Sequence, residues 1–171
     1  MLSVILLGYG EGEAPPRRES IVRSLASLVD ATVQGLIADA VLAGPPNIGL
    51  EKIADEAGCA LVEQESPASG LAAALGAARR CDVFLFAAGH AVERGFVDEA
   101  RDILAFGGLE RARVLKSAPD SFLTRLAPNL GRPVGLLARK EEILRAGASD
   151  FGVLARRLRG RDLDVRARKC W

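Results

Sequence analysis

Over the first two thirds of the chain, short apolar runs alternate with longer segments in which apolar residues recur every three or four positions. The runs have the length of buried strands, and the longer segments have the periodicity of helices. This alternation is typical of βαβ units, which build a largely parallel sheet covered on both faces. We therefore expect an α/β fold with three αβα layers around a mainly parallel sheet. The pattern predicts strands at residues 3–7, 40–43, 60–62 and 82–86, and helices at 21–29, 50–57, 70–80 and 96–104, of which the second is stopped by Gly58.

Beyond residue 104 the pattern is less regular, although it still contains both kinds of element. It predicts strands at residues 112–115 and 133–137, and helical stretches at 122–126, 141–145 and 151–158. A chain of 171 residues has the length of one domain. We expect a single domain over residues 1–171, with a first half at 1–104 and a second half at 105–171 that ends in a basic tail.

Charge and composition exclude some classes of protein. The 23 Lys and Arg residues nearly balance the 22 Asp and Glu residues, which leaves a formal net charge of +1. Such a chain has no strong overall field to attract nucleic acid, so we expect no nucleic-acid partner. No apolar run reaches the roughly 18 residues that a membrane span requires, so we expect a cytoplasmic protein.

In an open α/β sheet, ligands bind outside the carboxyl ends of the strands. The residues that follow the predicted strands are therefore the candidates for binding: the segment 8–12, the pair Ala43 and Gly44, and Ala88 to His90. The segment 8–12 contains three glycines but matches no standard phosphate-binding motif. It fits either a loop whose backbone approaches a phosphate or a tight turn in which glycine adopts a positive φ.

The order and the amino-acid sequences of several segments resemble the nucleotide-sugar-binding half of the small family 2 glycosyltransferases, which have the GT-A fold. The segments are 25–29, 35–42, 53–59, 70–78 and 82–86. Residues 134–137, 147–150 and 155–158 are similar to the acceptor-binding segment of that family, so the resemblance covers about residues 2–165. It implies a fold like that of the nucleotide-diphospho-sugar transferases.

The resemblance also implies a ligand and a set of site residues. The ligand is a nucleotide-sugar, a UDP- or GDP-sugar, and the residues expected near it are Gly8, Ala43, Gly44, Gly70, Ala88 and His90. In the family, a Glu-Asp pair supplies the catalytic base; this chain has Ser149 and Asp150 at that place, which leaves Asp150 as the candidate base.

A divalent metal is the cofactor of that family, held by an Asp-x-Asp motif at the end of the fourth strand. This chain has Ala88, Gly89 and His90 at that place, so the motif is missing. Mg²⁺ and Mn²⁺ prefer oxygen ligands, and an Ala-Gly-His triplet is expected to bind them far more weakly than two carboxylates. A metal-assisted reaction by the usual route of the family is therefore in doubt, and His90 is the one candidate metal ligand.

Two of these residues have an ordinary structural interpretation beside the functional one. His90 is either a ligand for a metal or a diphosphate, or a residue of a solvent-exposed turn before the next helix. Asp150 is either a general base or the N-cap of the helix predicted at 151–158, and the two roles are compatible.

The basic tail has three interpretations. It is a solvated helix face with a frayed end, a patch that faces phosphate, or a contact with a membrane surface. The apolar residues available for a peripheral membrane contact are Leu154, Leu158, Leu163, Val165 and Trp171.

The functional hypothesis is a glycosyltransferase-like protein that binds a nucleotide-sugar and transfers the sugar to an unknown acceptor. The alternative is a catalytically impaired pseudoenzyme that serves as a binding or interaction module. A nucleotidyltransferase is a third and weaker hypothesis, because it also needs acidic metal ligands. The sequence does not indicate the oligomeric state.

Overall fold

The computed structural model describes residues 1–10, 16–106, 109–119 and 131–170. The strands are β1 Leu2–Leu7, β2 Ile37–Gly44, β3 Ala60–Glu63, β4 Asp82–Ala87, β5 His90–Val92, β6 Arg113–Ser117, β7 Pro133–Arg139 and β8 Arg161–Lys169. The helices are α1 Arg18–Ala26, α2 Val29–Val33, α3 Leu50–Ala57, α4 Pro67–Ala77, α5 Phe96–Ala105, α7 Lys140–Ala146 and α8 Phe151–Arg157.

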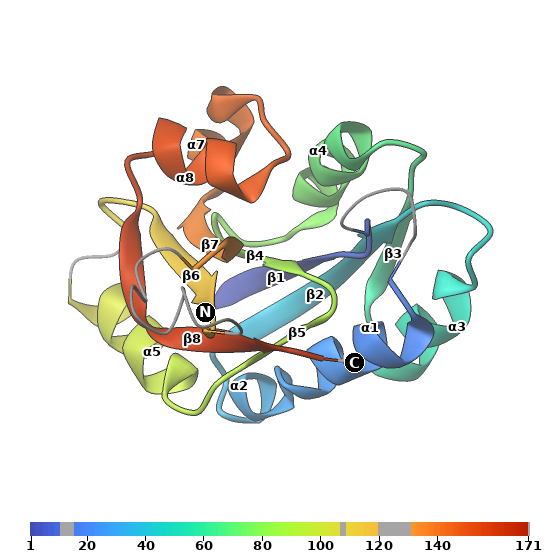
Figure 1. Ribbon diagram of the computed structural model, residues 1–171, viewed down its shortest axis with the longest axis horizontal. Helices are drawn as coiled ribbons and strands as arrows, with labels where there is room; N and C mark the ends of the chain where they lie inside the picture. The colour runs from blue at the N-terminus through green and yellow to red at the C-terminus, as the bar shows by residue number, and fades with distance from the viewer. Residues whose placement is uncertain (11–15, 107–108, 120–130, 171) are drawn as a thin grey trace.

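All the described strands belong to one curled sheet with the order β3-β2-β1-β4-β7-β6-β8-β5 (Figure 1). β1 is paired in parallel with β2 on one side and with β4 on the other, and β3 adds a third parallel pair. β7 runs antiparallel to both β4 and β6, and β5 runs antiparallel to β8, whereas β6 and β8 are parallel. Both predicted halves of the chain therefore contribute strands to the same sheet.

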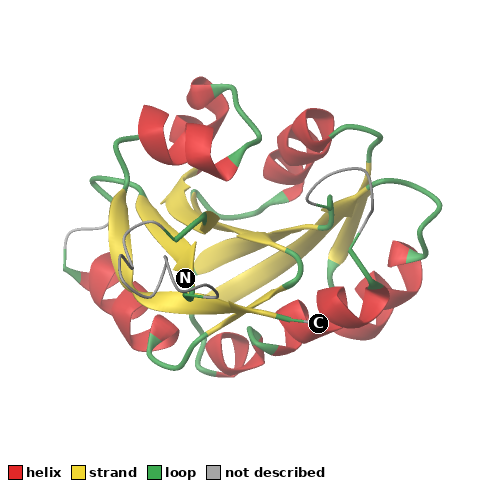
Figure 2. Ribbon diagram, viewed as in Figure 1, coloured by secondary structure: helices red, strands yellow, loops and turns green. Residues whose placement is uncertain are grey.

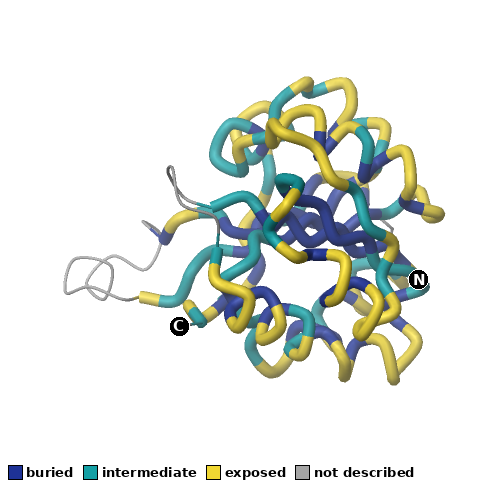
Figure 3. Tube along the Cα trace, turned by 90° about the vertical axis from the view of Figure 1, so that its right-hand side faces the viewer, coloured by how far each residue is buried: buried dark blue, intermediate teal, exposed yellow. Residues whose placement is uncertain are grey.

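Helices cover both faces of this sheet, as Figure 2 shows. α4, α7 and α8 lie on one face, and α1, α2, α3 and α5 lie on the other. Each face has its own apolar cluster, and the strands between them are the most buried part of the chain (Figure 3). On the α5 side, Phe84 packs against Phe86 and Phe96 with ring centroids 5.4 Å and 4.6 Å away. The expected three-layer α/β fold is thus confirmed.

The predicted strands at 3–7, 40–43, 60–62, 82–86, 112–115 and 133–137 are all present, with bounds that differ by a few residues. The helix predicted at 21–29 is two helices, α1 and α2, with a turn at Ser27 and Leu28 between them. The hydroxyl of Ser27 donates to the Ser24 carbonyl at 2.7 Å, and the backbone N–H of Val92 donates to the Ser27 hydroxyl at 3.2 Å. The stretch 122–126 lies outside the described residues.

The helix-face interpretation of the basic tail is wrong for residues 161–169, which form strand β8 between β6 and β5, whereas Arg156 and Arg157 lie on helix α8 and are exposed. Leu163 and Ala167 face the core and are 1% and 0% exposed, respectively. Leu154 of α8 is also fully buried, so two of the five residues considered for a membrane contact do not reach the surface. Trp171 lies outside the described residues. No helix in the described ranges is long and apolar enough to cross a membrane.

At the amino edge of the sheet, one buried hydroxyl ties β1 to its neighbours. The Ser3 hydroxyl donates to Asp39 Oδ1 in β2 at 2.6 Å and accepts the backbone N–H of Arg80 at 2.9 Å. The other carboxylate oxygen of Asp39 accepts the backbone N–H of Arg79 at 3.1 Å. The side chains of Ser3 and Asp39 therefore accept hydrogen bonds from the two backbone N–H groups of the turn between α4 and β4.

We predict that Ser3→Ala lowers the free energy of unfolding by about 1–3 kcal/mol, because it removes one partner of a buried network and leaves the other groups unsatisfied. Denaturant unfolding followed by circular dichroism measures this change. The control is Thr32→Ala, whose exposed side chain bonds only within its own helix and whose loss is expected to cost about 0.5 kcal/mol or less. Equal losses in the two variants would contradict the role of Ser3.

At the opposite edge, the ring of Tyr9 lies against helix α4. Its hydroxyl donates to the carbonyl of Gln64 at 2.9 Å. A Cβ atom added to Gly70 would overlap the Tyr9 hydroxyl and ring, so Gly70 is the residue that lets Tyr9 approach the helix. Burial raises the pKa of the Tyr9 phenol above its usual value, and the nearby charge of Glu65 raises it further, so Tyr9 is a neutral donor at pH 7.

We predict that Gly70→Ala destabilises the protein by about 1–3 kcal/mol, because the new methyl group forces Tyr9 out of its position. Gly76 lies in the same helix with nothing within 4 Å of an added Cβ. Gly76→Ala should therefore stabilise the protein by roughly 0.5–1 kcal/mol through helix propensity. Thermal unfolding of both variants tests this. In the Tyr9→Ala background, Gly70→Ala should destabilise the protein much less, because the ring that the new methyl group displaces is already absent.

Candidate functional site

A hollow of about 250 Å³ lies at the carboxyl edge of the sheet, where ligands are expected in α/β proteins. β1 and β4 end there, and the antiparallel strand β7 begins there. The first turns of α4 and α8 contribute the opposite walls. The lining residues are Leu7, Tyr9, Gly10, Pro67, Ala87, Arg132, Pro133, Val134, Ser149, Asp150 and Phe151.

Asp150 is placed on this hollow by helix α8, which starts immediately after it. Its Oδ1 atom accepts the backbone N–H of Val153 at 2.8 Å, so Asp150 is the N-cap of the helix, as one of its two interpretations predicts. The residue is exposed and lines the hollow. The residue that caps helix α8 therefore also lines the hollow.

Arg132 is a second charged residue on the same hollow, and no motif in the sequence singles it out. Its backbone carbonyl accepts the N–H of Ser117 at 2.8 Å, which fixes it between the end of β6 and the start of β7. The residue is exposed and lines the hollow. Since β7 is antiparallel, its first residues lie at the carboxyl edge, and no local pattern in the sequence indicates that direction.

The predicted residues Gly8, Ala43 and Gly44 lie together at the ends of β1 and β2, beside the hollow and not on it. The N–H of Gly8 donates to the carbonyl of Ala43 at 2.6 Å. A Cβ on Gly8 would lie 3.2 Å from that carbonyl oxygen, and one on Gly44 would lie 2.5 Å from Leu50 Cδ1. These residues are small because protein atoms pack against them. Neither Gly8 nor Gly10 has a positive φ, so the tight-turn interpretation is wrong for these two, and Gly12 lies outside the described residues.

Gly70 is likewise covered by Tyr9, which itself lines the hollow. Ala88 is fixed at the end of β4, where its N–H donates to the carbonyl of Leu7 at 3.0 Å. Gly89, with a φ of +91°, then turns the chain away from β4, and its N–H donates to Ser24 Oγ at 3.0 Å.

His90 is not part of a solvent-exposed turn. It is the first residue of β5, is paired with Lys169 of β8, and is 6% exposed. The hydrophobic pattern does not predict β5, which is why His90 was expected in a loop. The residues that line the hollow do not include His90.

The described residues do not fit a divalent metal ion. They contain no group of three or more His, Cys, Asp or Glu side chains close enough to share an ion. At the end of β4, Ala87, Ala88 and Gly89 have no side-chain oxygen, and among the residues that the structure describes Asp150 is the one acidic residue that lines the hollow. Three acidic residues, Glu11, Glu13 and Asp120, lie outside the described ranges.

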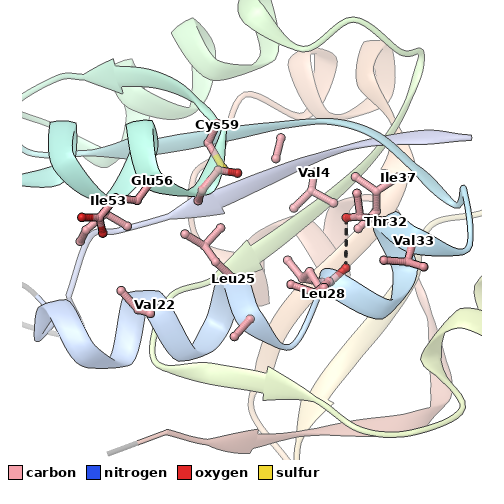
Figure 4. A pocket seen from close by; sticks show the side chains of 14 residues that line it. Val4, Val22, Leu25, Leu28, Thr32, Val33, Ile37, Ile53, Glu56 and Cys59 are labelled. Atoms are coloured by element: carbon pink, nitrogen blue, oxygen red, sulfur yellow. Dashed lines mark hydrogen bonds between the residues drawn. The ribbon is translucent and has the colours of Figure 1, made fainter.

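A different, apolar groove of about 430 Å³ lies on the opposite face of the sheet, between α1, α2 and α3 (Figure 4). Its walls are almost entirely aliphatic, with Glu56, Thr32 and Cys59 as the polar exceptions. The Thr32 hydroxyl is occupied by a bond to the carbonyl of Leu28 at 3.2 Å. This groove has no set of polar groups that suits a nucleotide-sugar.

Comparison with known proteins gives no match by sequence: no protein-family model and no curated protein matches the chain. Solved structures do match. Glucosyl-3-phosphoglycerate synthase from Mycobacterium tuberculosis, solved with Mn²⁺, UDP and glucosyl-3-phosphoglycerate, is 16% identical with a TM-score of 0.62 over 94% of this chain and 68% of that chain.

Two further matches cover almost the whole of this chain. UTP-bound UGPase from Acinetobacter baumannii is 13% identical with a TM-score of 0.63, over 99% of this chain and 88% of that chain. The 4-diphosphocytidyl-2C-methyl-D-erythritol synthase from Anaerococcus prevotii is 9% identical with a TM-score of 0.63, over 99% and 89%. These likenesses show that the chain has the GT-A-like fold of the nucleotide-diphospho-sugar transferases.

Proposed function

We propose that this protein binds a nucleotide-sugar, a UDP- or GDP-sugar, in the hollow at the carboxyl edge and transfers the sugar to a hydroxyl acceptor. The observation that carries the proposal is that two residues of opposite charge, Asp150 and Arg132, both line that hollow. The likeness to structures solved with UDP or UTP supports the class of ligand.

The reaction that fits these two groups is a displacement at the anomeric carbon of the sugar. The bond from that carbon to the diphosphate oxygen breaks, and a bond to the acceptor oxygen forms. Asp150 takes the proton of the acceptor hydroxyl as general base. The nucleoside diphosphate leaves with the electron pair of the broken bond, and Arg132 stabilises its charge through charge-assisted hydrogen bonds.

A divalent metal has no step in this proposal, because the described residues do not fit one. Three of the matching structures contain Mn²⁺ or Mg²⁺ together with UDP. Among the described residues of this chain, Arg132 is the cationic residue that lines the hollow. The predicted contacts at Gly8, Ala43, Gly44, Gly70 and Ala88 would then act by shaping the edge on which the nucleotide lies.

A second candidate function is a binding module that holds the nucleotide-sugar without transferring the sugar. The absence of carboxylates at the end of β4, where Ala87, Ala88 and Gly89 stand, favours it. The two functions differ in turnover and agree in binding, so one titration and one activity assay separate them.

We predict that UDP-glucose or GDP-mannose raises the melting temperature of the protein equally with and without Mn²⁺, because a ligand that binds only the folded state stabilises it. Differential scanning fluorimetry and calorimetry measure the effect. Arg132→Gln should weaken binding about tenfold through the loss of a charge-assisted contact. Arg79→Gln, a change of an exposed arginine at the other edge, is the control. No stabilisation by any UDP- or GDP-sugar at millimolar concentration would refute the proposed ligand.

We predict that Asp150→Asn leaves the melting temperature nearly unchanged, because asparagine is as good an N-cap as aspartate. The same change removes the base and should lower the rate of nucleotide release from the nucleotide-sugar by about 10²-fold or more. Asp55→Asn, at an exposed position of α3, is the matched control for charge. An active Asp150→Asn variant would exclude Asp150 as the base, and a wild-type protein that binds without turnover would identify the binding module.

A further inference from the structure

A hollow of about 550 Å³ lies at the amino edge of the sheet, on the opposite side from Asp150 and Arg132. It is bounded by the C-terminal end of α5 and by the starts of the parallel strands β6 and β8. The elements that form it lie toward the left of Figure 1. The residues that line it are Asp102, Ile103, Phe106, Glu110, Arg111, Arg113 and Arg161.

Two of its arginines are direct neighbours in the sheet. Arg113 of β6 and Arg161 of β8 are opposite each other in the β6–β8 pairing. Leu115 and Leu163, two residues further along each strand, are both buried in the cluster on the α5 face, so the alternation of the strands turns both arginines to that face. Like charges opposite each other on paired strands are destabilising. The repulsion between Arg113 and Arg161 therefore lowers the stability of the fold.

A buried donor adds to that cost. Arg113 Nε is buried and has no hydrogen-bond partner. In the part of the chain that the structure describes, neither Arg111, Arg113 nor Arg161 makes an ion pair, although Asp102 and Glu110 line the same hollow. A guanidinium donor removed from water without a partner is expensive, and an oxyanion that accepts its hydrogen bonds offsets that expense.

The remaining charges of the hollow leave room for an anion. Its lining has three arginines against two carboxylates, a net charge of +1. The C-terminal end of α5 adds partial negative charge, which helps to hold the arginines but satisfies none of their donors. Phe106, an aromatic residue that also lines the hollow, is 88% exposed.

We propose that this hollow is a phosphate-binding site, in which Arg111, Arg113 and Arg161 hold the phosphate oxygens and Phe106 contacts the organic part of a phosphate monoester. Arginine suits this role because its planar fork of donors matches phosphate oxygens. The site is separate from the hollow of the proposed function, so it does not depend on that function.

The test is a titration of the full chain with inorganic phosphate and with phenyl phosphate, at constant ionic strength, followed by calorimetry. Saturable binding is expected, and Arg111→Gln/Arg161→Gln should weaken it about tenfold. Both side chains are exposed, so the double variant is expected to fold. Arg94→Gln, an exposed arginine before the other end of α5, is the control and should bind as the wild type does.

The set of variants also shows where the phosphate binds. Absence of saturable binding, or an equal loss in Arg94→Gln, would overturn the proposal. A loss confined to Arg132→Gln would also overturn it, because the phosphate would then occupy the hollow of Asp150. Tighter binding of phenyl phosphate that disappears in Phe106→Ala supports the contact of Phe106 with the organic part of a monoester, and equal affinities for phenyl phosphate and inorganic phosphate would contradict that contact.

A second measurement does not require the ligand. If Arg113 and Arg161 repel each other, Arg161→Gln should raise the melting temperature of the ligand-free protein by about 1–3 °C at low salt. The same variant should gain less from added phosphate than the wild type. A lower melting temperature in the ligand-free Arg161→Gln variant would show that Asp102 and Glu110 already satisfy this charge, and would contradict the proposal.

Discussion

The parallel pairing of β1 with a strand on each side is the constraint on which the rest of the structure depends. β1 is buried on both faces and along both edges, because it lies between β2 and β4 and pairs with both. This arrangement fixes the ends of three strands at one edge. At the other edge, Ser3 and Asp39 bond to each other and accept hydrogen bonds from the backbone of the turn that leads into β4. The hollow of Asp150 exists because β1 and β4 stop together and β7 starts beside them.

Much of this fold can be predicted from the sequence, since the central strands are continuous apolar runs and such runs mark strands buried on both faces. The last strand could not be recognised from its charges. Charged residues dominate the segment 161–169, yet Leu163, Val165 and Ala167 alternate with them, which is a period of two and the signal of a half-buried strand. His90 was misplaced for a related reason, because β5 is only three residues long and pairs with that unrecognised strand.

Some residues of the candidate site can likewise be predicted from the sequence, and others cannot. Asp150 can be predicted, because an N-cap residue directly before a helix has a recognisable local pattern. Arg132 cannot, because its position follows from the antiparallel direction of β7, which only the tertiary structure sets. The glycines at the ends of β1 and β2 and in α4 were expected to face a ligand, whereas Ala43, Leu50 and Tyr9 pack against them. A small residue at a strand end indicates close approach without indicating what approaches.

The insertion of β8 between β6 and β5 has a consequence for the order in which the chain folds. Strands β1 to β4 are complete by residue 87, and the pairing of β7 with β4 and β6 is complete by residue 139. The free edge of β6, however, is covered only by residues 161–169. During synthesis the nascent sheet therefore presents an unpaired edge while the segment that covers it is still inside the ribosome. An unpaired edge is where chains associate with one another, so the protein is most exposed to aggregation in that interval.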